Sequence, residues 1–165
     1  MLFNCLMRKK EYLSFFLITI IFTSCCPPCH QWKLASIKGD CPSSNYIKAY
    51  LPTRNTFNGI EPELVCTNGL LQLYLNAHSL QFPCNSDNHA QTNVEVIIGD
   101  QDYCFIAERL EGGQRLLLPN EALEIIVCSL LEKNNVEITI GRYESTLIYE
   151  GFPSIYNSLI KISAS

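Results

Sequence analysis

The stretch GLLQLYLNAHSLQF, residues 69–82, is the part of the chain that decides the fold. Leu71, Leu73 and Leu75 are each separated by one residue of more polar character. Because successive side chains of a strand point to opposite faces, this period of two predicts a strand with one buried face. The chain is therefore expected to form a sheet with a core on one side.

Short runs of similar character lie on both sides of this stretch. Gly112-Gly113 and the run Asp100-Gln101-Asp102 separate neighbouring runs and predict hairpin turns. Arg142-Tyr143-Glu144 is expected to connect two further strands at the surface. The additional strands are expected at residues 46–51, 63–66, 94–99, 103–110, 136–141 and 145–152.

One helix is predicted over residues 120–133. Its apolar residues recur at the spacing of a single helical stripe, and Asn120 is expected to cap its first turn. A second, shorter helix is expected over residues 153–162, with Pro153 or Ser154 at its start. The stripe of the first helix consists of Leu123, Ile126, Val127, Leu130 and Leu131.

These elements predict the fold class. Strands joined by tight turns pair as antiparallel neighbours, and many short strands with one or two helices are typical of a domain built on antiparallel sheet. We expect an α+β or β-sandwich-like domain. Its antiparallel sheet would have seven or eight short strands, with one helix at about 120–133 and a short C-terminal helix.

Length and charge limit the classes of function. The 165 residues are enough for one domain with a core, and the formal net charge is −4. The first 24 residues hold three basic and one acidic side chain, so the remainder carries nine basic against fifteen acidic side chains. Nucleic acid is excluded as a partner, because its phosphates require clustered Lys and Arg.

The N-terminal segment has the pattern of a leader. Arg8-Lys9-Lys10 precedes LSFFLITIIF, residues 13–22, an apolar run of the length found in signal peptides. A helix that crosses a membrane needs about 20 apolar residues, so this run is too short for a span. Met7 begins a well-formed leader by itself, and the sequence leaves open whether translation starts at Met1 or Met7.

Phe22-Thr23-Ser24-Cys25 resembles the lipobox of bacterial lipoproteins. The resemblance implies that residues 1–24 are removed as a signal peptide and that a covalent lipid on the Cys25 thiol anchors the chain, with no other cofactor. It also implies the outer membrane, because the residue after the lipidated cysteine is Cys26 and not Asp. The side of that membrane, periplasmic or surface, stays open.

The adjacent run Cys26-Pro27-Pro28-Cys29-His30 has the spacing of a c-type haem attachment site. It also contains the C-x-x-C of redox pairs, and Cys41 could complete a zinc site. Disulfides are the favoured interpretation, since the leader places the chain in an oxidising compartment. Residues 25–44 are then a lipidated, Cys- and Pro-rich tether, and residues 45–165 form a single β-rich domain.

The cysteine count predicts disulfides. Nine cysteines are present, and seven remain once Cys5 is lost with the leader and Cys25 is lipidated. Seven is an odd number, so one thiol stays free or bonds to another chain, while the connectivity is open. The candidates are Cys26, Cys29, Cys41, Cys66, Cys84, Cys104 and Cys128.

Catalytic motifs are absent from the sequence. The nucleophile elbow, the zinc-protease helix, the phosphate loop and the dinucleotide fingerprint do not occur. Apart from His30, the histidines are His78 and His89, which we interpret as surface loop residues. A hydrolase that uses a Ser/His/Asp or Cys/His site is the weaker alternative, with Asp87 near His89 in the polar loop 83–93.

The aromatic residues of the strands allow two interpretations. They either pack the sheet or form a face that binds a partner protein or a glycan. They are interleaved with polar residues in both cases. The residues are Tyr46, Tyr50, Tyr74, Tyr103, Phe105, Tyr143 and Tyr149.

Two hypotheses of function follow. The first is a non-enzymatic, lipid-anchored envelope lipoprotein with a structural or partner-binding role, and an intermolecular disulfide as one means of binding. In size and cysteine content the chain resembles the small cysteine-rich lipoproteins of chlamydia-like bacteria, whose envelopes rely on disulfide cross-links. The alternative is a periplasmic redox or c-type haem protein that uses Cys26, Cys29 and His30.

Overall fold

Nine strands and two helices make up the described part of the chain. The computed structural model describes residues 30–37 and 46–163, and nothing before, between or after them. The strands are β1 (Lys33–Ile37), β2 (Tyr46–Tyr50), β3 (Ile60–Thr67), β4 (Leu70–Ala77), β5 (Gln91–Ile98), β6 (Gln101–Arg109), β7 (Arg115–Leu117), β8 (Val136–Ile140) and β9 (Tyr143–Leu147). The helices are α2 (Asn120–Leu131) and α3 (Phe152–Ser163).

The strands form one sheet in the order β1-β2-β3-β4-β7-β6-β5-β8-β9, and every named pair is antiparallel. The expected antiparallel α+β fold is confirmed. The β-sandwich alternative is wrong, because the strands belong to one open sheet. The expected seven or eight strands are also too few for the described residues, which contain nine.

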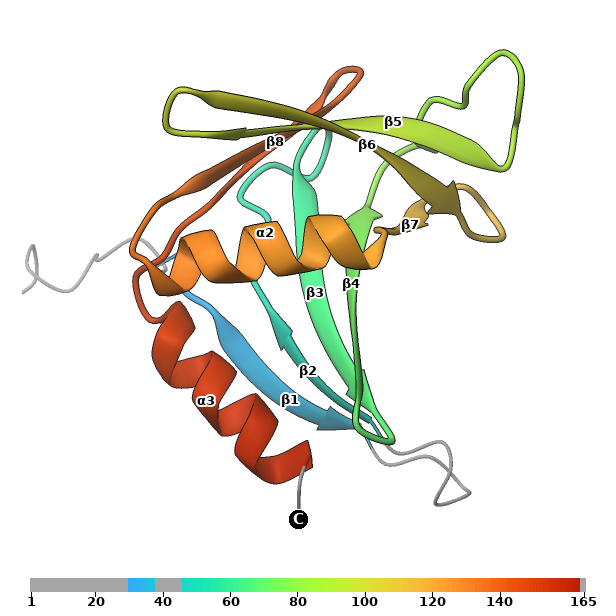
Figure 1. Ribbon diagram of the computed structural model, residues 1–165. Helices are drawn as coiled ribbons and strands as arrows, with labels where there is room; N and C mark the ends of the chain where they lie inside the picture. The colour runs from blue at the N-terminus through green and yellow to red at the C-terminus, as the bar shows by residue number, and fades with distance from the viewer. Residues whose placement is uncertain (1–29, 38–45, 164–165) are drawn as a thin grey trace, which may run out of the picture.

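The three-residue strand β7 joins two halves of the sheet. One half is β1 to β4, and the other contains β5, β6, β8 and β9. The sheet is strongly twisted, so that β5 and β6 run across the direction of β3 and β4 (Figure 1). Helix α2 lies in the angle between the halves and contacts β4 and β8, while α3 packs against β1, β2 and β3.

The core lies between the sheet and the two helices, α2 and α3. Leu73 and Leu75 of β4 are 2% and 0% exposed, as the period of two predicted. Helix α2 contributes Ile126 and Leu130 from its apolar stripe, both 1% exposed. Leu131 is the member of the stripe that the structure leaves partly outside, since the helix ends there.

The expected cap of α2 is wrong. Pro119, with φ −66° and ψ 156°, is the N-cap residue, and Asn120 is already the first helical residue. The extended backbone of the proline ends the preceding segment, and its carbonyl accepts the first helical hydrogen bond from the Leu123 amide at 3.1 Å. The helix also ends earlier than predicted, at Leu131 instead of residue 133.

Part of the expected tether belongs to the sheet. Strand β1 pairs with β2 from Lys33↔Tyr50 to Ile37↔Tyr46, although the domain was expected to begin at residue 45. Trp32 is 6% exposed, and its indole Nε1 donates a hydrogen bond to the Ile148 carbonyl at 2.6 Å. The remaining tether residues, 25–29 and 38–44, lie outside the described residues, as does the leader.

Two hairpins turn one or two residues away from their expected places. The β5–β6 turn is Gly99-Asp100, where Gly99 has φ +60°, so Gln101 and Asp102 already belong to β6. The β8–β9 turn is Gly141-Arg142, and Tyr143 is a strand residue with 1% exposure. Both glycines supply the positive φ that a two-residue hairpin needs.

Candidate functional site

Four of the candidate cysteines lie in the described residues, and all four are unpaired. Cys66 of β3 is buried, whereas Cys84, Cys104 and Cys128 are exposed. They lie on a loop, on β6 and on α2 respectively, so no two of the exposed thiols share an element. Disulfides among these four are not formed, while pairing with Cys26, Cys29 or Cys41, which lie outside the described residues, stays a prediction.

Cys84 is distinguished from the other thiols by its neighbour. Its Sγ lies 3.1 Å from Nδ1 of His89, five residues further along the loop between β4 and β5. Both side chains are exposed. A thiol beside an imidazole nitrogen can give its proton to the ring, and the resulting thiolate is the form of cysteine that attacks other sulfur atoms.

The loop that carries this pair is held by Arg109 at the end of β6. The guanidinium donates one hydrogen bond to the His89 carbonyl at 2.7 Å and another to the Phe82 carbonyl at 3.0 Å. The amide of Asn85 donates to the Gln91 carbonyl at 2.9 Å and closes the loop on itself. These bonds fix both ends of the segment that contains Cys84 and His89.

The pair also provides two of the groups that a Cys/His hydrolase needs, because the thiol of Cys84, a possible nucleophile, contacts His89. A triad also needs a group that orients the histidine. Asp87 shares the loop but accepts a hydrogen bond from the Ser86 hydroxyl at 3.0 Å. The geometry therefore fits thiol–disulfide exchange, which needs a thiolate and a proton acceptor, better than hydrolysis.

His78 has a different partner. Its Nε2 lies 3.5 Å from Oε2 of Glu61 on the outer face of the sheet. The expectation that His78 is a surface residue is confirmed, because its side chain is 45% exposed. Among the described residues, no hydrogen bond or ion pair joins His78 to Cys84 or His89, so His78 is not part of their site.

His30 is the first described residue and lies against the domain. It lines a cavity of about 400 Å³ together with Thr53, Arg54 and Asn58. Burial lowers the pKa of His30 below its ordinary 6.5, and the positive Arg54 guanidinium lowers it further. Its Nδ1 is buried without a hydrogen-bond partner, and Cys26 and Cys29 of the C-x-x-C-H motif lie outside the described residues.

The aromatic residues divide between the two faces. Phe105 and Tyr143 are core residues, 8% and 1% exposed. Tyr50 and Tyr74 lie on the outer face, because each stands opposite Glu63 in the strand register. Packing therefore accounts for the first two, and a binding role remains open only for the outer face.

A cluster of charged side chains connects neighbouring strands on that outer face. Glu63 is 5% exposed and forms ion pairs with Lys48 of β2 and with Arg115 of β7, the latter at 3.1 Å. The Arg115 guanidinium also lies 4.1 Å from the centre of the Tyr74 ring. One carboxylate thus links strands on both of its sides, which assigns a structural role to the cluster.

The comparisons with known proteins add no relative. No family model, no curated protein and no solved structure matches this chain. Within the described residues no group of three His, Cys, Asp or Glu side chains is placed to hold a metal ion. Neither α2 nor α3, the helices of the described segments, has the length and apolar character needed to cross a membrane.

Sequence reasoning named Cys84 and His89 separately but did not join them. Five residues of separation fit neither a helical turn nor strand alternation. The only signal was the composition of the loop 83–93, which is too polar to be buried and contains both residues. The closing contacts come from Arg109, a residue that no motif marks.

Proposed function

We propose that this chain is a lipid-anchored lipoprotein of the bacterial outer membrane, with a non-enzymatic role in which its domain is joined to a partner protein by a disulfide at Cys84. The lipobox-like segment ending at Cys25 supports the anchor. The single observation that supports the covalent partner is the exposed Cys84 thiol in contact with His89. The oxidising side of the membrane supplies disulfides with which such a thiol exchanges.

The linkage forms by exchange and needs no separate oxidant. The His89 imidazole takes the proton of Cys84, and the thiolate attacks one sulfur of a disulfide on the partner. The new bond joins Cys84 Sγ to that sulfur, the partner's own S–S bond breaks, and its second sulfur leaves as a thiolate. The partner is thus a protein with an accessible disulfide.

The test is a trapping experiment on the native membrane. Cells are treated with a thiol-alkylating reagent before lysis, and the chain is followed on gels without reductant. We expect a disulfide-linked species that disappears on reduction and in the Cys84→Ser variant. Cys104→Ser, which removes an exposed thiol of β6, is the matched control and should leave the species in place.

Persistence of the linked species in Cys84→Ser, or its loss in Cys104→Ser alone, would overturn the role of Cys84. The anchor is tested separately by the intact mass of the mature chain extracted from membranes. A chain that begins at Cys25 and carries acyl groups supports the lipoprotein. A chain that is free of lipid contradicts it, whatever the cysteines do.

The alternative is a redox or haem protein that uses Cys26, Cys29 and His30. One observation favours it: His30 lies beside a cavity of about 400 Å³. A c-type haem would add its own mass to the chain through two thioether bonds and would colour the protein. The same mass measurement therefore separates this alternative from the lipoprotein.

A further inference from the structure

Two apolar side chains project from neighbouring loops of the domain. Phe57, in the loop between β2 and β3, is 79% exposed, and Leu80, just after β4, is 58% exposed. The loops touch, because the Ser79 hydroxyl donates a hydrogen bond of 2.6 Å to the Phe57 carbonyl. Single apolar residues on a surface are ordinary, so their meaning depends on how they are held and where they point.

The loop that carries Phe57 is held rigidly. The Asn55 Oδ1 accepts a hydrogen bond from the Phe57 amide at 2.9 Å, and the Asn55 carbonyl accepts one from Gly59 at 2.9 Å. The Asn58 carbonyl accepts a bond from the Glu144 amide at 2.9 Å, which fastens the loop to β9. This backbone presents the phenyl ring to the outside.

The loop that carries Leu80 is fixed in the same way. The buried Tyr143 donates its phenolic hydrogen to the Leu80 carbonyl at 2.8 Å. Arg142 donates to the Tyr143 oxygen at 3.2 Å and is itself exposed. The Arg142 guanidinium and the backbone of Leu80 thus meet at the same tyrosine oxygen.

The lipid anchor would be close to the same loops. His30 lines one cavity with Arg54 and Asn58, which flank Phe57 in the sequence. Only four residues, 26–29, separate His30 from Cys25. A fully extended chain spans about 3.6 Å per residue, so Cys25 lies within about 18 Å of His30, which is about half the width of a folded domain of this size.

On the basis of the lipid anchor proposed above, we propose that the face carrying Phe57 and Leu80 docks on the bilayer that holds the anchor. The short reach keeps this end of the domain at the membrane surface, where Phe57 and Leu80 meet the boundary between headgroups and acyl chains. Arg54, in the same loop as Phe57, and Arg142, which bonds the tyrosine that holds the Leu80 carbonyl, are both exposed and can meet lipid phosphates.

Apolar contact is the main attraction in this arrangement. The chain after residue 24 has an excess of six acidic side chains, so anionic lipid repels the domain as a whole. Glu144 also lies near the loop and accepts a hydrogen bond from the Asn58 amide group at 3.5 Å. We therefore expect docking on zwitterionic lipid.

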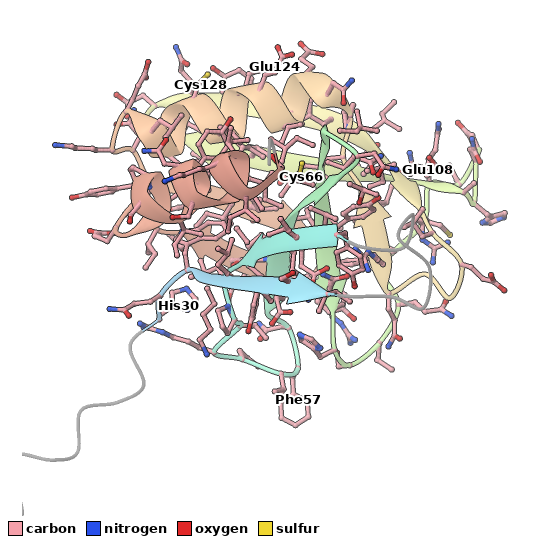
Figure 2. The ribbon with its side chains drawn as sticks, turned by 90° about the horizontal axis from the view of Figure 1, so that it is seen from below. His30, Phe57, Cys66, Glu108, Glu124 and Cys128 are labelled. Carbon is pink, nitrogen blue, oxygen red and sulfur yellow. The ribbon has the colours of Figure 1, made fainter. Side chains whose placement is uncertain are left out.

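Figure 2 shows what such docking would leave in water. Phe57 and His30 lie on one side of the molecule, and Glu124 and Cys128 of α2 lie on the opposite side. Helix α2 would lie on the side of the domain that is turned away from the membrane. Its exposed Glu124 provides the matched control position for the test.

The experiment uses the mature, lipidated full chain in phosphatidylcholine vesicles with or without brominated acyl chains, which quench tryptophan at close range. The chain contains one tryptophan, Trp32, which is buried. In Phe57→Trp we expect brominated lipid to lower the added emission about twofold, as for a side chain inserted at the interface. In Glu124→Trp and in the unsubstituted chain we expect no such loss.

If Phe57→Trp does not fold, Leu80→Trp serves as the second test variant. Brominated lipid should quench the emission of the tryptophan at position 80 as well. Equal quenching at positions 57 and 124, or none at 57 and 80, would overturn the docking face. The intact mass of the same sample shows whether the lipid is present. A lipidated chain without quenching contradicts the docking alone, whereas a chain that carries no lipid contradicts the anchor on which docking depends.

Discussion

The contact between Cys84 and His89 should be visible in the reactivity of the thiol. Replacing His89 by Gln keeps a polar side chain but removes the base 3.1 Å from Sγ. We expect the reaction of Cys84 with a small aromatic disulfide at neutral pH to slow about tenfold, because the base that accepts the thiol proton is removed. The measurement is a stopped-flow rate in a chain with Cys104→Ser and Cys128→Ser, which leaves Cys84 as the exposed thiol of the described domain.

The control for this prediction is His78→Gln. His78 faces Glu61 and should leave the rate unchanged. An equal rate in the His89→Gln variant and the parent would mean that the imidazole does not assist the thiol. The exchange step at Cys84 would then lose its base.

The environment of His30 predicts how the stability of the fold depends on pH. Burial and then the Arg54 charge hold its pKa below the ordinary 6.5, so the unfolded chain binds the proton more readily than the folded one. The stability associated with a neutral His30 is therefore complete above pH 6.5 and is lost as the pH falls from 6.5 to the lower folded-state pKa. Below that pKa the loss is complete.

The measurement is thermal unfolding of the unsubstituted chain and of His30→Gln at about pH 8 and about pH 5. Other groups titrate in both proteins, so the difference between them isolates His30. We expect the unsubstituted chain to lose more of its melting temperature on acidification. An identical loss in both would show that the ring is as free to take up a proton in the folded state as in the unfolded state.

Gly59 tests the loop that presents Phe57. A Cβ at this position would lie 1.8 Å from the Thr53 hydroxyl oxygen and 2.3 Å from the Asn55 carbonyl oxygen. Since the second of these is backbone, the loop must move, and Gly59→Ala should lower the free energy of unfolding by about 2–4 kcal/mol. Gly99→Ala meets no atom within 4 Å and should cost only about 1 kcal/mol for its positive φ. Chemical denaturation of both variants measures the contrast, and equal costs would contradict the close packing of the loop.

The first strand tests where the domain begins. Trp32 packs against Phe152 of α3 with ring centres 4.8 Å apart, and it bonds the Ile148 carbonyl. Trp32→Ala should destabilise the fold by about 3–5 kcal/mol, whereas Trp32→Phe keeps a ring and should cost less. Urea denaturation followed by far-UV circular dichroism provides the values. If Trp32→Ala leaves the free energy of unfolding unchanged, the segment that contains Trp32 and β1 is part of the tether and not of the domain.

The elements that the sequence predicted are long enough for their apolar residues to repeat, at every second residue in β4 and at every third or fourth residue in α2. Strand β1 is not, because Lys33–Ile37 is five residues long and has the mixed burial of an edge strand, so its membership is decided by β2 and α3. Tyr143 was assigned to a connection because its polar neighbours hide its burial, which depends on Phe82 at 4.9 Å in the folded chain. Long-range contacts of this kind leave no local signal.

At the scale of the molecule, the question is whether the two halves of the sheet unfold together. Strand β7 is short, and Leu116 at its centre stands opposite Leu75 of β4 and Arg109 of β6. Leu116 is 0% exposed and belongs to a core that extends across both halves and α2. A shared core of this kind favours one cooperative transition.

The prediction is that Leu116→Ala lowers the free energy of unfolding by about 2–5 kcal/mol without separating the halves. Trp32 fluorescence reports the half that contains β1, and far-UV circular dichroism reports the whole chain, so the two melting curves should coincide before and after the change. Leu70→Ala removes the same atoms from a side chain that is 58% exposed, and it should shift the curves by no more than about 0.5 kcal/mol. Curves that coincide in the parent and separate in Leu116→Ala would mean that the Leu116 side chain, and not the rest of the common core, couples the halves.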